Sequence, residues 1–170
     1  TPTNSLGWRE STSARALAQE RLYATADDAI PLYLAILSAN PDDAAASSGL
    51  QKARTALLRQ GDAALRTADS EADVMGESLR EALQVASVAR SIWPDDESVL
   101  AYLQRVDVAE QIVALDERGE RQLRQGALGE NGGDGALYSF RAALQLSPEN
   151  ARARQGLAAV ESALIRRAED

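Results

Sequence analysis

Three short proline-centred strings recur along the chain at nearly constant spacing, and this regularity restricts the possible folds more than any other feature. Their prolines are Pro41, Pro94 and Pro148, which stand 53 and 54 residues apart. An alanine precedes each proline by twelve residues and a leucine follows it by nine: Ala29, Ala82, Ala136, Leu50, Leu103 and Leu157. Self-similarity at a fixed period is typical of repeat proteins. We therefore expect three equivalent helix junctions, with each proline at the first position of a new helix, where its missing N–H costs nothing.

Apolar and small residues follow each proline at the 3–4 spacing of a helix with one buried face. The stripes are Leu50, Ala53, Leu57, Gly61, Ala64 and Ala68, then Val99, Tyr102, Val106, Ala109 and Val113, then Ala153, Leu157, Val160 and Leu164. The first two predict helices of roughly 20 to 30 residues, longer than the average of about 11 to 12. Shorter helices are expected near 28–39, 78–92 and 135–146, and an opening helix near 11–24. The fold class is therefore all-α, built of antiparallel helical hairpins.

The shorter helices resemble the second helix of the tetratricopeptide repeat (TPR) family. Two of them follow that family's order of alanine, aromatic residue and proline: Ala136, Phe140 and Pro148, and Ala29, Tyr33 and Pro41. The middle copy has Ala86 at the aromatic position, and we expect it to pack less deeply or to use Trp93 as a substitute. Small residues at Gly61, Ala68, Gly119 and Gly126 are similar to the close-packed positions of the family's first helix.

This resemblance implies a TPR-like superhelix of about three degenerate repeats, covering residues 11–168 after a flexible N-terminal segment, 1–10. The repeat of about 53 residues exceeds the family's 34, which puts a standard peptide-binding groove in doubt. Repeat regions of bacterial envelope proteins, such as TonB-type energy transducers, have similar hairpins of a long and a short helix.

A charged string occurs twice in the expected long helices. Asp62 and Arg66 stand in the first copy, and Glu120 and Arg124 stand in the second, 58 residues later. On one interpretation these four side chains form a ladder on the concave face that holds a partner's charged groups. On the other they are local i,i+4 pairs that stabilise each helix by a few tenths of a kcal/mol.

The two tryptophans are further candidates for contact with a partner, because exposed tryptophans often anchor interfaces. Trp8 stands in the N-terminal segment and docks either on this chain's own core or on a neighbour. Trp93 precedes a junction proline, and a packed hairpin corner is the alternative to a binding role. Tyr33, Tyr138 and Phe140 are expected in the core.

Residue content excludes several classes of function. The chain has no histidine and no cysteine, which removes imidazole and thiolate metal sites, cysteine and histidine nucleophiles, histidine general bases, and disulfides. A formal net charge of -8 argues against nucleic-acid binding. Paired acids at 27–28, 42–43 and 95–96 are explained as helix caps, and the loop 129–135 lacks the ligand pattern of a calcium loop. We expect no enzyme, cofactor or metal.

These observations favour a non-catalytic scaffold module that binds a protein or peptide on a repeat face. The alternative is a structural spacer or self-association region, and a homodimer is compatible with both. No apolar run is long enough to cross a bilayer, so no direct membrane insertion of this segment is expected. The polar start, 1–5, suggests a piece of a longer bacterial protein. We expect a membrane-anchored periplasmic protein, with a cytoplasmic one as the alternative.

Overall fold

The computed structural model is all-helical and describes residues 2–70, 75–130 and 132–170. Seven α-helices and no strands are found in these ranges: α1 (Pro2–Ala18), α2 (Ala29–Ala39), α3 (Ala44–Ser70), α4 (Met75–Ile92), α5 (Glu97–Arg124), α6 (Ala136–Leu146) and α7 (Ala151–Glu169). The all-α prediction is thereby confirmed. The opening helix begins at Pro2 rather than near Ser11, so most of the segment 1–10 is helical.

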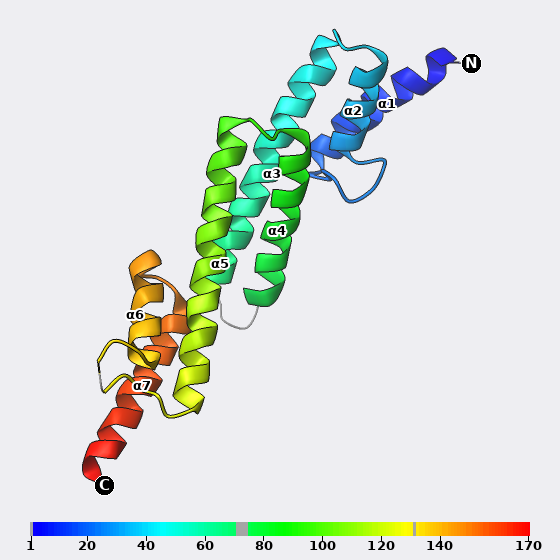
Figure 1. Ribbon diagram of the computed structural model, residues 1–170. Coiled ribbons are helices and arrows are strands. Elements are labelled where there is room, and N and C mark those ends of the chain that lie inside the picture. The colour runs from blue at the N-terminus through cyan, green and yellow to red at the C-terminus, as the bar shows by residue number, and fades with distance from the viewer. Residues whose placement is uncertain (1, 71–74, 131) are drawn as a thin grey trace.

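The helices follow one another along an elongated molecule, with the two termini at opposite ends (Figure 1). Helix α1 packs against α2, α3 against α4, and α5 against α6, each pair running antiparallel. Helix α7 packs against α6 and also touches α5 and α3. None of the helices in the described ranges is apolar over a length that would cross a membrane.

The three junctions share one geometry, and it differs from the prediction in the place of the proline. The residue two positions after each proline is Asp43, Asp96 or Asn150. Its backbone N–H donates to the carbonyl oxygen of the residue before the proline, which closes a β-turn. Their side chains then accept the N–H of the residue three positions on, at 2.8, 3.1 and 2.7 Å. The prolines therefore lie at the second position of a turn, where their fixed φ is favourable, and the helix caps are the fourth residues.

Aromatic side chains pack directly on glycines where helices approach one another. A Cβ on Gly49 would overlap Tyr33, and one on Gly156 would overlap Phe140. Gly119 also faces Phe140, since its Cβ would lie 2.7 Å from the ring. These glycines are required because any larger residue would force the helices apart.

In the middle copy the aromatic residue comes from the other helix. Tyr102 of α5 is fully buried, packs on Gly61 of α3, and donates its hydroxyl to the Ala82 carbonyl at 2.7 Å. Trp93 is only partly buried at the edge of the same core. The expected substitution by Trp93 is thus wrong, because Tyr102 is the buried aromatic residue that packs on a glycine in this copy.

The buried residues form two separate cores. The larger holds α1 to α4 and the first part of α5, up to Val106, and the smaller holds the rest of α5 with α6 and α7, from Ile112 onward. The predicted stripes contribute buried residues to both, including Ala53, Leu57 and Val160, and the shorter helices supply most of the others. Within the described ranges, α5 is the helix that contributes buried residues to both cores.

Candidate functional site

An apolar groove of about 690 Å³ opens where the two cores meet. One wall is the end of α3 and the other is the middle of α5, while α4 contributes Leu79 and the segment that joins α6 to α7 contributes Leu146, Ser147 and Asn150. Its main apolar residues are Leu65, Leu79, Val108, Ile112, Val113 and Leu146. Val108 is 38% exposed and Leu146 is 42% exposed, so apolar surface is open to water here.

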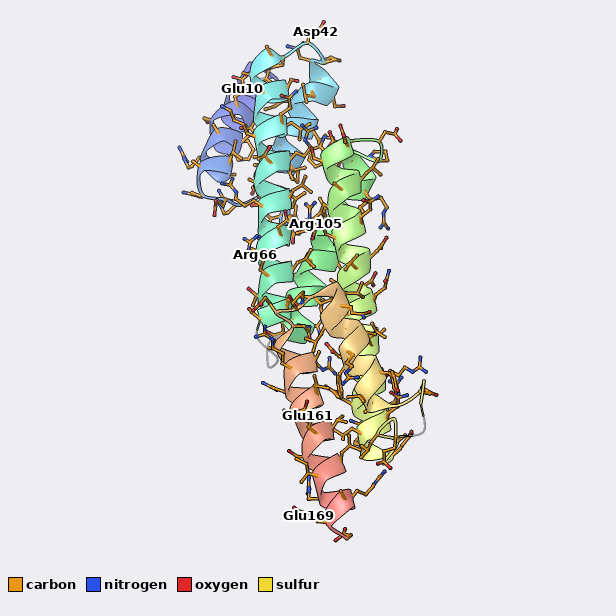
Figure 2. The ribbon with its side chains drawn as sticks, turned by 90° about the vertical axis from the view of Figure 1, so that its left-hand side faces the viewer. Glu10, Asp42, Arg66, Arg105, Glu161 and Glu169 are labelled. Carbon is orange, nitrogen blue, oxygen red and sulfur yellow. The ribbon has the colours of Figure 1, made fainter. Side chains whose placement is uncertain are left out.

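Four charged residues line this groove: Asp62, Arg66 and Asp69 from α3, and Arg105 from α5. Arg66 and Arg105 lie at neighbouring levels of these helices, about midway along the molecule (Figure 2). Arg105 pairs with both oxygens of Asp62, at 2.9 and 3.0 Å. Arg66 is exposed and forms no ion pair or hydrogen bond with the residues that the structure describes.

Asp69 connects the end of α3 to the start of α7. One of its carboxylate oxygens accepts the Ser147 hydroxyl at 2.5 Å, and the other accepts the Asn150 side-chain amide at 3.0 Å. Asn150 also caps α7 and is almost completely buried. Asp69 therefore ties the turn between α6 and α7 to the end of α3, beside the groove.

One helical turn beyond the last groove residue of α5, Val113, the helix buries a carboxylate. Asp116 is 0% exposed, and neither of its oxygens has a hydrogen-bond partner among the described residues. Burial raises the pKa of Asp116 to about 6, and the charges of Glu120 and Asp69 add to the rise. Arg152 and the Asn150 amide oppose it.

Glu120 lies on the same helix and is engaged by α7. Arg152 donates two hydrogen bonds to it, at 2.5 and 2.7 Å. These bonds hold the pKa of Glu120 below its usual value, and burial partly offsets the effect. Glu120 thus pairs with α7, as Asp62 pairs with α5, and its side chain is 32% exposed.

The structure brings two of the predicted partner-binding residues together and separates the other three. Asp62 and Arg66 both line the groove. Glu120 and Arg124 do not, and Trp8 lies on α1, 52% exposed, at the far end of the molecule. Neither Asp62 nor Glu120 bonds the arginine four residues on, because each pairs instead with an arginine of another helix.

Comparison with family models, curated proteins and solved structures finds no match for this chain. The site must therefore be interpreted from its own residues. Within the described ranges, no three acidic side chains are placed to hold a metal ion.

Sequence reasoning missed Arg105, Asp69 and Asp116. Asp116 carried a signal, since it continues the buried stripe of α5 three residues after Val113, where an apolar residue is expected. Arg105 and Asp69 carried none, because their partners lie 43 and about 80 residues away in the chain.

Proposed function

We propose that this chain is a non-catalytic scaffold module of a larger bacterial protein, which binds a protein partner in the groove between α3 and α5. The groove carries this proposal. It combines open apolar surface, which in soluble proteins often marks a site of association, with an exposed arginine that has no partner among the described residues and can pair with an acidic group.

We further propose that the architecture is TPR-like, with about three degenerate repeats. Support comes from the three equivalent proline turns and from the packing of Tyr33 and Phe140 on glycines sixteen residues later in the chain. Repeats of this kind contact mainly their neighbours and so present an extended face. A periplasmic location in a membrane-anchored protein remains our proposal, with the cytoplasm as the alternative.

Two matched variants test the proposed function. Val108→Arg blocks the groove, whereas Leu100→Arg places the same charge on the same helix at a residue that is 45% exposed and does not line the groove. Immobilised wild type and both variants are used to capture proteins from cells that express the chain, after circular dichroism has shown equal helicity.

We expect a partner that is retained by wild type and Leu100→Arg and lost by Val108→Arg. A partner retained by all three would contradict binding in the groove. Reproducible absence of any partner would contradict the scaffold function itself.

A spacer or self-association role is the second candidate, and the elongated shape with termini at opposite ends favours it (Figure 1). Helix α7 adds an open apolar residue near the C-terminal end, since Ile165 is 60% exposed. Sedimentation of wild type beside Ile165→Glu distinguishes the two forms of this role. A dimer that the substitution dissociates supports self-association, and a concentration-independent monomer leaves only the spacer.

A further inference from the structure

We infer that the groove takes an amphipathic α-helix of a protein partner, with an acidic residue beside its apolar face that pairs with Arg66. This inference rests on the proposed function and specifies the chemistry of the partner.

Charge selects the acidic residue. The four charged side chains of the groove sum to zero, but three of them are already engaged: Asp62 and Arg105 by each other, and Asp69 by Ser147 and Asn150. Among these four charged side chains, Arg66 is the one without an ion pair or side-chain hydrogen bond to a described residue. A guanidinium is a planar fork that matches a carboxylate with two hydrogen bonds, so a partner's Asp or Glu is the complementary group.

The groove's walls favour a helix over an extended peptide. Both walls are helices whose backbone groups are bonded internally, so the groove offers no sheet edge to an extended chain. An extended peptide would leave its own N–H and C=O groups unpaired against the apolar lining, which is unfavourable. A helix satisfies its backbone internally and presents only side chains.

The length of the groove fits about three helical turns. The lining residues of α5 extend from Ala101 to Val113, which corresponds to about 18 Å at 1.5 Å per residue. A partner helix of about twelve residues covers this distance, with apolar side chains at i, i+4 and i+7 against Val108 and Ile112. Its acidic residue then lies at the side that faces α3.

The test uses a display library of 18-residue amphipathic helical peptides. Apolar residues are fixed at i, i+4 and i+7, and the flanking positions are randomised over acidic, basic and neutral residues. Selected peptides are measured against wild type, Arg66→Glu and Arg124→Glu. The last is the matched control, because Arg124 occupies the same place in its string, is exposed, and does not line the groove.

We expect selected peptides to carry Asp or Glu at one flanking position and to bind Arg66→Glu at least about tenfold more weakly than wild type, with little change for Arg124→Glu. Selection on Arg66→Glu should instead enrich Lys or Arg. Peptides that compete with one another, fail on Val108→Arg and show no acidic preference would overturn this inference and leave the proposed function standing.

Two other outcomes overturn it differently. If the library yields no binder to the groove while a natural partner is lost by Val108→Arg, the groove binds something other than a helix. Dodecanoate serves as a small-molecule probe, and binding of dodecanoate that Arg66→Glu abolishes, with no peptide selected, would make the groove a site for apolar carboxylates.

Discussion

Asp116 is a fully buried carboxylate, and neither of its oxygens has a hydrogen-bond partner within hydrogen-bond distance among the described residues. Its pKa is raised from 3.8 to about 6 in the folded protein, so the folded state binds this proton more tightly than the unfolded chain does. Its contribution to stability is therefore fully present below about pH 4 and is lost as the pH rises through about 6. At 1.36 kcal/mol per pKa unit, the loss is on the order of 3 kcal/mol.

Replacing Asp116 with Asn removes the titration. We expect the difference in unfolding free energy between Asp116→Asn and wild type to change by about 2 kcal/mol between pH 4.5 and 7.5, in favour of the variant at the higher pH. Urea unfolding across this range measures it. The charges facing Asp116, on Arg152, Glu120 and Asp69, are the same in both proteins. A difference that does not vary with pH would show that Asp116 is hydrated or paired.

At the scale of the elements, the three proline turns have chemically similar helix caps, but the caps differ in how many other interactions they make. Asp43 makes one capping bond in a partly exposed place. Asn150 makes the same bond, is buried, and also holds Asp69 at the end of α3. Its removal would break a cap and leave a carboxylate oxygen of Asp69 without its donor.

Matched alanine substitutions measure this inequality. We expect Asp43→Ala to lower the unfolding free energy by about 1 kcal/mol, the usual value of a cap. Asn150→Ala should cost about 2 to 4 kcal/mol, because the half-buried Asp69 carboxylate loses a donor in addition to the lost cap and the buried side-chain packing. Equal losses, measured by chemical denaturation, would mean that the contact between α3 and α7 contributes nothing.

These elements also show how far the sequence leads. The proline spacing and the apolar stripes place six of the helices to within a few residues, because both reflect local turns and one-sided burial. The aromatic residue at Tyr102 also had a signal in the sequence. Two copies have an aromatic residue and then a small one sixteen positions later, Tyr33 with Gly49 and Phe140 with Gly156, whereas the middle copy has the reverse order, Ala86 and then Tyr102. The groove could not be predicted from the sequence. It depends on the distance along α5 between the first core and the core of α6 and α7, and no local sequence pattern determines that arrangement.

The whole molecule is divided by its two cores, and they are unequal in size. The smaller core depends on Phe140, which is fully buried between Gly119 of α5 and Gly156 of α7. Cooperative units with fewer buried apolar contacts open at lower free energy. The C-terminal part of the chain should therefore unfold without the rest when this ring is removed.

Hydrogen exchange detected by mass spectrometry follows this opening helix by helix. Phe140→Ala, a loss of about 3 to 5 kcal/mol, should remove protection from α6, α7 and the end of α5, and leave α2 to α4 protected. Tyr33→Ala is the mirror control, and should expose α1 and α2 first. Uniform loss of protection in either variant would show that the two cores unfold as one.

Helix α5 continues without a break from one core to the other. We therefore expect the two cores to move relative to each other by bending of this helix. Long helices curve smoothly unless a proline, a glycine–serine pair or an inserted side chain kinks them. Helix α5 has neither a proline nor such a pair, so we expect it to bend smoothly. Half of this helix is about 21 Å long, and a bend of about ten degrees at its middle moves its end by about 4 Å. A load applied between the two termini would bend α5 at the level of the groove, so tension along the molecule and occupancy of the groove would be mechanically coupled.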